Sequence, residues 1–379
     1  MLIGSLPVHS RICTGMGISF QSLVNAMSAG GFAFRSINTT PLPESEVVGR
    51  FSLLHILEKL WVVLNIWFRM PWYKHVYTVI SSSVPGFCKD FLIIWPAWLL
   101  GKRVVLHLNG GGYKDFFYNQ PLTFRVVIER TLRKASLIIV LDDLLREQFD
   151  FVKHHEHKLR VVPNGMSADL SPDELPRRSS PRELGELRIL FLSNLMPSKG
   201  YKDLLHALGI LRQRGIPFRC DFCGQFLQAV AENQSFSPEY LRREFYDNLR
   251  VLDLEKRVVF HGTLLGREKQ QILERAHVFV LPTYYPWEGQ PVSIIEALAF
   301  GLPVIATQHK AIPGQVIHGY NGYLVQKQAP LQIANSLQHL QKEPLVWERM
   351  SNNAVQLFQQ RFRREVHLEK LIPLITDQA

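Results

Sequence analysis

Short apolar runs alternate with segments of helical periodicity along this chain of 379 residues, and that alternation restricts the fold more than any other feature. Four apolar runs of the first half read as strands, at 32–37, 75–80, 104–108 and 137–141. Helical patterns separate or precede them, at 18–29, 54–68 and 123–134. Strands that alternate with helices form a parallel sheet with helices on both faces. The sequence therefore predicts an α/β domain.

The alternation restarts in the second half of the chain, after a polar, proline-rich stretch at 167–186 that is typical of a linker. The later strands are expected at 188–192, 218–222, 258–260, 278–281 and 304–306. A helix at 203–214 carries leucines on one face and ends at Gly215. We therefore expect two doubly wound α/β domains.

The expected division of the chain places a first domain at 1–166, the linker at 167–186 and a second domain at 187–345. Helices at 346–379 are expected to cross back to the first domain. In such sheets, ligands bind beyond the carboxyl ends of the strands. With two such domains, the cleft between them is the expected site.

The charge is uneven, because residues 1–160 hold 18 Lys and Arg against 11 Asp and Glu, within a net charge of +10. This excess indicates either a basic solvated surface or a polyanionic partner, such as anionic lipid, a phosphate-bearing acceptor or nucleic acid. No nucleic-acid recognition motif accompanies it, so a nucleic-acid partner is not expected.

Cysteine usage and hydropathy indicate a cytoplasmic protein without a membrane span. Cys220 and Cys223 have the spacing of metal ligands, but no second pair completes a site, so buried thiols are expected. Nothing demands disulfides. The apolar runs at 60–68 and 91–100 fall short of the roughly 20 residues of a spanning helix, and no signal-peptide pattern is visible.

The densest candidate site runs from Leu281 to Gly301, where a predicted strand is followed by a Pro/Gly loop and a helix that starts near Pro291. The amides of Gly289, Gln290 and Val292 would lie at the helix N-terminus, where they can bind phosphate. Glu288 in the loop and Glu296 in the helix can face one ligand. The alternative is a capping box at 293–296 and a solvated loop glutamate.

Three further segments carry candidate ligand groups, each after a predicted strand or before a helix. In the segment from Ser193 to Gly200, Lys199 can reach a phosphate, or is simply exposed. Gly15 and Gly17 permit close backbone approach but lack the third glycine of a dinucleotide fingerprint, and an ordinary turn is the alternative. His107 and Asn109 share one face of a strand end, before three glycines.

Together these motifs resemble the retaining family 4 glycosyltransferases of the GT-B fold. The most specific element is Glu-x7-Glu, here Glu288 to Glu296, and the resemblance is strongest from Ile189 to Val325. Further matching positions are Pro282, Gly301, Pro303, Asn321–Val325, Val162–Gly165, Gly224 and Phe260–Gly262.

The resemblance implies the roles of these residues. Glu288 would bind the donor sugar's hydroxyls and Glu296 the ribose. Lys199 would neutralise the diphosphate with the amides from Gly289 to Val292, Pro291 lying among them. The other donor contacts implied are Gly15, Gly17, Asn194, Gly200 and Gly224. The acceptor would bind mainly to the first domain.

Two positions depart from the family pattern. Asn194 stands where many relatives have an arginine, so one cationic phosphate contact is missing. Asn109 stands where relatives often have a histidine near the reacting sugar, and an amide cannot act as a base. His107, two residues back on the same face, is the candidate to replace it.

The implied reaction moves a sugar from a nucleotide-diphosphate sugar to a hydroxyl acceptor, with retained configuration, in polysaccharide or lipid-linked glycan synthesis. No cofactor and no obligate metal are expected, since no Asp-x-Asp triplet is present. The alternatives are a catalytically silent sugar- or nucleotide-binding subunit, an epimerase or a phosphorylase.

Aromatic and basic residues gather between positions 61 and 74: Trp61, Trp67, Phe68, Arg69, Trp72, Tyr73 and Lys74. Amphipathic aromatic residues beside cations suit a membrane interface, and core packing is the alternative. The first interpretation predicts a lipid-linked glycan acceptor and peripheral contact with the inner face of an anionic membrane.

Overall fold

The computed structural model describes residues 1–6, 15–39, 53–166, 185–228 and 236–377. The chain divides into two compact units, which are described separately. Unit 1 comprises Met1–Ser167 and Arg364–Ala379, and unit 2 comprises Ala168–Arg363. The helix α11 (Pro344–Arg361) therefore belongs to unit 2, and only the following helix α12 (Arg364–Thr376) joins unit 1. The predicted linker, apart from its last two residues, lies outside the described part, as do Cys13 and Thr14.

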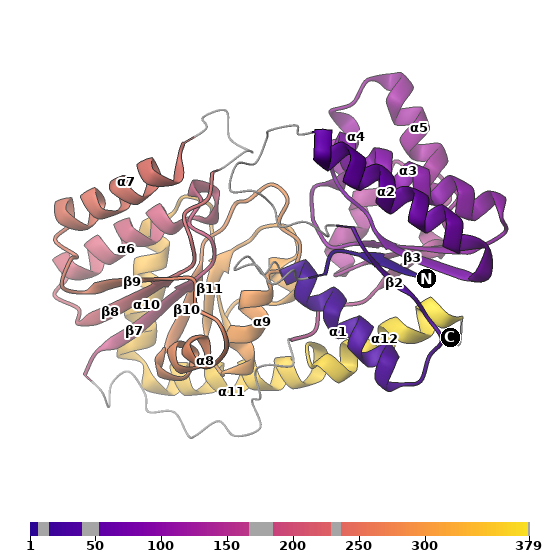
Figure 1. Ribbon diagram of the computed structural model, residues 1–379. Coiled ribbons are helices and arrows are strands. Elements are labelled where there is room, and N and C mark those ends of the chain that lie inside the picture. The colour runs from indigo at the N-terminus through magenta and orange to yellow at the C-terminus, as the bar shows by residue number, and fades with distance from the viewer. Residues whose placement is uncertain (7–14, 40–52, 167–184, 229–235, 378–379) are drawn as a thin grey trace. The chain divides into compact units, whose positions relative to one another are not determined.

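Unit 1 is built on a parallel sheet of order β2-β1-β3-β4-β5-β6. Its strands β2 and β3 and its helices are labelled in Figure 1. Its strands are β1 (Leu2–Gly4), β2 (Ser36–Asn38), β3 (His75–Val79), β4 (Arg103–Leu108), β5 (Leu137–Val140) and β6 (Leu159–Val161). Its helices are α1 (Gly15–Ala29), α2 (Leu53–Arg69), α3 (Val84–Leu99), α4 (Tyr113–Tyr118), α5 (Leu122–Leu132) and α12. Short 3-10 turns are η1 (Met70–Trp72), η2 (Asp143–Phe149) and η3 (Glu156–Lys158).

One part of the core of unit 1 lies between the sheet and the helices α1 and α12. Phe20, Leu23 and Met27 of α1 pack with Leu371 and Ile375 of α12 against the apolar strand residues. These strands are apolar on both faces because helices cover the sheet on both sides.

Unit 2 repeats the architecture, with a parallel sheet of order β12-β11-β10-β7-β8-β9. Its strands are β7 (Leu187–Leu192), β8 (Phe218–Cys223), β9 (Val258–Gly262), β10 (Val278–Leu281), β11 (Val304–Thr307) and β12 (Gly322–Val325). Its helices are α6 (Tyr201–Gln213), α7 (Pro238–Val251), α8 (Gly266–Arg275), α9 (Val292–Ala299), α10 (Pro330–Lys342) and α11. The 3-10 turns are η5 (Pro197–Lys199) and η6 (Ile312–Gly314).

The two sheets confirm the predicted class of two doubly wound α/β domains. The strand expected at 32–37 is displaced, since β2 covers Ser36–Asn38. The apolar stretch 91–100 is the second half of α3, which continues through Pro96. Among the described residues, no helix is long and apolar enough to cross a bilayer.

Candidate functional site

The strand order of unit 2 reverses between β7 and β10, which lie side by side in the centre of the sheet. In open α/β sheets, the crevice at such a reversal, beyond the carboxyl ends of the strands, is where ligands bind. Lys199 ends the short turn η5 that follows β7, and Glu288 lies in the loop that follows β10. The topology therefore brings both sequence-predicted residues to the same edge of the sheet.

Glycine is required at the two turns that shape this edge. Gly200 has φ of +75°, and a Cβ atom there would lie 2.1 Å from the carbonyl oxygen of Pro282. Gly224 has φ of +140°, and a Cβ atom would lie 2.0 Å from the carbonyl oxygen of Ser193. Because only glycine tolerates both the dihedral angle and the close approach, these positions hold the strand-end loops together.

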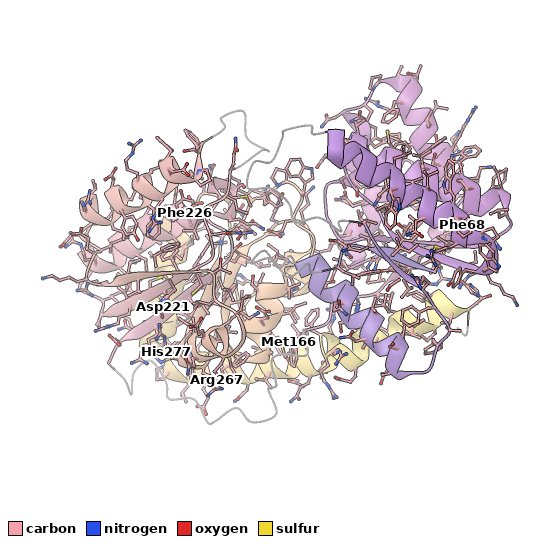
Figure 2. The ribbon with its side chains drawn as sticks, viewed as in Figure 1. Phe68, Met166, Asp221, Phe226, Arg267 and His277 are labelled. Carbon is pink, nitrogen blue, oxygen red and sulfur yellow. The ribbon has the colours of Figure 1, made fainter. Side chains whose placement is uncertain are left out.

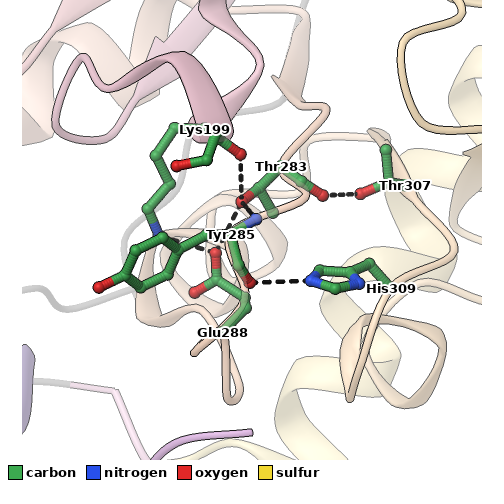
Figure 3. A network of polar contacts seen from close by, with 7 residues as sticks. Lys199, Thr283, Tyr285, Glu288, Thr307 and His309 are labelled. Carbon is green, nitrogen blue, oxygen red and sulfur yellow. Dashed lines mark hydrogen bonds and ion pairs between the residues drawn. The ribbon is translucent and has the colours of Figure 1, made fainter. Parts of the chain in front are cut away.

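Lys199 and Glu288 are directly paired, with 2.7 Å between the Lys199 Nζ and the Glu288 Oε2 atoms (Figure 3). The Thr283 hydroxyl donates to the same carboxylate oxygen at 2.9 Å, and the Lys199 ammonium lies 4.6 Å from the centre of the Tyr285 ring. Both charged side chains are largely buried. The pair is therefore preorganised, with a cation held beside an aromatic face and a carboxylate.

Backbone contacts fix the loop that carries Glu288. The Tyr284 amide donates to the Ser198 carbonyl at 2.7 Å, which joins this loop to the Lys199 turn. His309 Nε2 donates to the Tyr285 carbonyl at 2.8 Å, and burial lowers the pKa of His309 (Figure 3). Thr307, at the end of β11, donates to the Thr283 carbonyl. Segments at the ends of β7 and β11 thus fix the loop that follows β10.

The helix α9 begins directly after this loop, with Pro291 as its N-cap residue and no side-chain cap from that position. Gly289, Gln290 and Pro291 are buried, and Val292 is the first helical residue. Glu296 lies within the helix, and its Oε1 atom contacts Lys269 Nζ at 2.7 Å. This places the Glu296 carboxylate in an ion pair rather than in the capping contact that the alternative required.

Lys269 is a residue that the sequence did not single out. It lies on α8 and, with Glu296, forms a second largely buried Lys–Glu pair. In the sequence it stands in a polar helix, Gly266–Arg275, and looks like one cation of a solvated face. Its contact with Glu296 could not be predicted from the sequence, because a strand and a loop separate α8 from α9 along the chain.

Buried ion pairs of this type can exchange their partners with a ligand. A cation and a carboxylate that leave water are stable only while each keeps a partner. An anionic ligand can take over the lysine, and hydroxyl groups of the ligand can donate to the released carboxylate. Both glutamates of the Glu-x7-Glu motif are held this way, so the edge suits a ligand that carries both phosphate and hydroxyl groups.

The remaining site candidates of unit 2 take no part in the two ion pairs. Asn194 is exposed, while Gly200 and the residues from Gly289 to Pro291 are buried. Cys220 and Cys223 are buried free thiols, as expected, and burial raises the pKa of both. No cluster of three or more His, Cys, Asp and Glu side chains suited to a metal occurs in the described part of the chain.

Unit 1 carries the remaining candidates at the carboxyl end of its own sheet. His107 Nδ1 lies 2.6 Å from the Tyr77 hydroxyl, and Nε2 of the same ring is buried without a hydrogen-bond partner. Burial and, secondarily, the nearby His367 lower the pKa of His107 to about 3. His107 is therefore neutral near pH 7 and a weak base, which argues against the proton-accepting role considered for it.

A small cavity of about 10 Å³ opens beside this histidine. Asn109, Asn164 and His367 line it together with His107, Tyr77 and apolar side chains. Asn109 Oδ1 is buried and unbonded, and His367 Nδ1 contacts the Pro163 carbonyl at 2.6 Å. The sequence did not identify Tyr77 or His367, and Asn164 was part of the matching stretch Val162–Gly165 without a role of its own. His367 comes from α12, at the far end of the chain.

The helix α1 begins at Gly15, and Gly17 lies buried in its first turn. The glycine pair therefore opens a helix in unit 1. The donor-site candidates Lys199, Glu288 and Glu296 all lie in unit 2.

Comparison with known families and proteins adds independent findings. Residues 173–357 match the family model described as glycosyl transferases group 1. The amylovoran biosynthesis glycosyltransferase AmsK of Erwinia amylovora is 29% identical over 266 residues, which are 65% of this chain and 60% of the relative. The putative colanic acid biosynthesis glycosyltransferase WcaL of Escherichia coli is 26% identical over 52% of this chain and 45% of its own length. The chain thus spans about half the length of these relatives.

Solved structures agree on the fold. HepE of Anabaena, solved in complex with UDP and glucose, superposes with a TM-score of 0.71 at 17% identity, covering 99% of this chain and 98% of its own. Sucrose-phosphate synthase of Thermosynechococcus elongatus gives a TM-score of 0.73 at 19% identity, covering 100% of this chain and 98% of its own. At this identity the likeness establishes the fold alone.

Proposed function

Because residues 173–357 match the family model of glycosyl transferases group 1 and the chain has the GT-B fold, we propose that it is a retaining glycosyltransferase. It moves a sugar from a nucleotide-diphosphate sugar to a hydroxyl acceptor. The observation that carries the proposal is the Lys199–Glu288 pair at the point where the strand order of unit 2 reverses. AmsK and WcaL are described as glycosyltransferases of amylovoran and colanic acid biosynthesis, which favours a role in polysaccharide synthesis. The acceptor in this proposal is a sugar or lipid-linked glycan.

In the proposed donor complex, the diphosphate takes the ammonium of Lys199 and the amides at the start of α9. The freed Glu288 carboxylate accepts hydrogen bonds from the sugar hydroxyls, and Glu296 accepts from the ribose. Gly200 and Gly224 let the strand-end loops approach the phosphates, and the roles implied for Gly15 and Gly17 of unit 1 stay a prediction. The exchange at Lys199 and Glu288 replaces one buried partner with another, so neither charge is left unpaired, while Lys269 keeps Glu296 in place for the ribose.

In the reaction, the bond between the sugar's anomeric carbon and the diphosphate oxygen breaks, and the acceptor oxygen bonds to that carbon on the same face. Negative charge grows on the leaving diphosphate, and a fixed ammonium with preorganised amides stabilises it. The acceptor proton passes to an oxygen of the leaving diphosphate. No protein base is required, which fits the low basicity of His107.

The acceptor binds to unit 1 in this proposal. The cavity beside His107 and Asn109 is lined by neutral polar groups, and two of their buried atoms lack partners. Such a lining suits a hydroxyl group, which can donate to Asn109 Oδ1 and accept from the imidazole.

A catalytically silent sugar- or nucleotide-binding subunit is the second candidate, because Asn109 and Asn194 replace a histidine and an arginine common among relatives. Incubation with a panel of nucleotide sugars, followed by NMR of the released sugar, separates the two. The enzyme releases sugar slowly without acceptor, and the first-formed product has the donor's anomeric configuration. Donor binding with no turnover, even with glycan acceptors, would establish the subunit.

No obligate metal is proposed for the reaction. We expect EDTA to leave the rate of sugar release unchanged, since the lysine and the amides supply the positive charge. Loss of activity in EDTA that Mg²⁺ or Mn²⁺ restores would contradict this.

A further inference from the structure

The helix α2 presents large apolar side chains to solvent. Trp61 is 61% exposed and Phe68 is 74% exposed, and Leu60 and Leu64 are about half exposed. Trp72 follows in η1 and is 70% exposed, with its ring 5.6 Å from that of Phe68. We call these five residues the outer face of α2; Phe68 is labelled in Figure 2.

The outer face is not the side that holds α2 on unit 1. Val62, Val63 and Ile66 are buried, and they occupy the opposite side of the same helical turns. Most surface helices place polar residues opposite their buried stripe, and a helix that is apolar all round is normally covered. Folding of unit 1 therefore leaves the apolar character of the outer face unexplained.

The apolar surface continues from α2 onto the end of α3. The indole of Trp67 donates to the Leu92 carbonyl at 2.6 Å, and Lys102 Nζ donates to the Pro71 carbonyl at 2.8 Å. Trp67 and Leu92 are themselves partly exposed, and the exposed Leu99 lies three residues before Lys102, at the end of α3. Exposed apolar side chains thus occur on two adjacent helices. They form a patch rather than the single scattered apolar residues that are normal on a protein surface.

The sequence from Lys59 to Lys89, which contains the outer face, carries cations and no acidic residue. Between these two lysines it contains Arg69 and Lys74. Among the described residues, no carboxylate forms an ion pair with Arg69, Lys74 or Lys102. The charge at the edge of the outer face is therefore uncompensated and positive.

We infer that the outer face of α2 is a docking surface for an anionic lipid bilayer. Indole and phenyl side chains sit in the interfacial region of a bilayer, and lysine and arginine beside them bind acidic headgroups. The partner is the surface of a membrane, because the face is a convex helix side with cations at its rim. This binding needs no nucleotide sugar, so it is independent of the proposed reaction, although it would bring the enzyme to a lipid-linked acceptor.

The test is sedimentation with vesicles in the absence of any sugar nucleotide. Wild-type protein is expected to sediment with phosphatidylcholine vesicles that contain phosphatidylglycerol and much less with phosphatidylcholine alone. High salt should release it, because the screening length falls from about 30 Å at 0.01 M to about 3 Å at 1 M. Lys74→Glu with Lys102→Glu should weaken binding at least ~20-fold, at about fivefold for each lost cation.

Phe68→Ser with Trp72→Ser should abolish sedimentation while circular dichroism and the unfolding midpoint stay unchanged, since both rings are exposed. Leu345→Ser with Val251→Ser, which removes two exposed apolar side chains of unit 2, is the matched control and should bind like wild type. Arg242→Glu with Lys256→Glu is the matched charge control.

Two results would overturn the inference. One is equal binding to vesicles by wild type and the Phe68/Trp72 variant. The other is wild-type protein that ignores anionic vesicles but forms a dimer that the same variant dissociates, which would assign the outer face to a second copy of the chain.

Discussion

The carboxyl ends of the two sheets offer very different chemistry. In unit 2, charged groups gather and each is paired, through Lys199 with Glu288 and Lys269 with Glu296. In unit 1, the groups are neutral: His107 has a pKa lowered to about 3, and it lies beside the Asn109 amide. Two of the buried polar atoms there lack partners. In the proposed function, the edge in unit 2 exchanges ionic partners with an anionic ligand, and the edge in unit 1 accepts a neutral group.

Removing the cation from the unit 2 edge should have the largest effect. Lys199→Ala removes the charge that stabilises the leaving diphosphate, so kcat should fall about 10²–10³-fold, as for loss of a preorganised donor. Steady-state kinetics of sugar release measure it. Lys202→Ala is the matched control, because that lysine, three residues on, pairs with Glu244 on α7. Equal losses in both variants would remove the special role of Lys199.

The pairing itself can be broken from the carboxylate side. Glu288→Ala leaves the Lys199 ammonium without its partner in a largely buried place, which should cost about 3 kcal/mol in the free energy of unfolding. Urea unfolding measures it. The double variant Lys199→Met with Glu288→Ala should recover most of this loss. If it does not, the pair does not hold the loop in the way described.

The second pair should have a smaller and different effect. Lys269→Met releases the Glu296 carboxylate from its fixed position, so the donor KM should rise about tenfold, the equivalent of one charged hydrogen bond, with little change in kcat. Lys269→Arg should retain most of the affinity. Arg267→Met, on the same helix but paired with Glu274 at the surface, serves as the control. A fall in kcat with unchanged KM would contradict a ribose-side role.

The buried, neutral His107 of unit 1 should make the stability of the protein fall in acid. Folded His107 binds a proton only near pH 3, whereas the unfolded side chain binds one near 6.5. Stability from this group is therefore complete above pH 6.5 and is lost as pH falls toward 3, at up to about 1.4 kcal/mol per pH unit.

His107→Gln should flatten this slope, and His157→Gln, at an exposed position, should not. Urea midpoints between pH 4 and 7 measure both variants. The shape of the kcat profile from pH 5 to 8 should be the same in wild type and His107→Gln. A limb that disappears in the variant would restore a proton-transfer role to His107.

The sequence predicted the central strands and the Glu-x7-Glu loop well, because the physics there is local. The strands β10 and β11 are short, fully buried runs, β10 followed by Pro282 and β11 preceded by Gly301 and Pro303, which is typical of buried parallel strands. The strand β1, with three residues, is too short for any periodicity, and β2 was placed too early. The helix α3 was not predicted, although Ser83 caps its start and Pro85 lies in its first turn.

The partners of the predicted site residues were beyond the sequence. Lys269 meets Glu296 across 27 positions, and Tyr77 meets His107 across 30. His367 reaches the cavity of unit 1 only because α12 returns to that unit. Such contacts depend on how strands and helices are ordered in space. The Glu-x7-Glu motif identified the two carboxylates in the sequence, but their pairing with Lys199 and Lys269 depends on the fold.

The most direct test of the central claim, that the Lys199–Glu288 pair is the donor site, is a thermal-shift titration with a panel of nucleotide sugars. A ligand that binds only the folded form raises the unfolding midpoint in proportion to its affinity. Wild type and Lys202→Ala should respond to the same nucleotide sugar, and Lys199→Ala and Glu288→Ala should not. A full response in Lys199→Ala and Glu288→Ala, or none in wild type with any donor, would contradict the account.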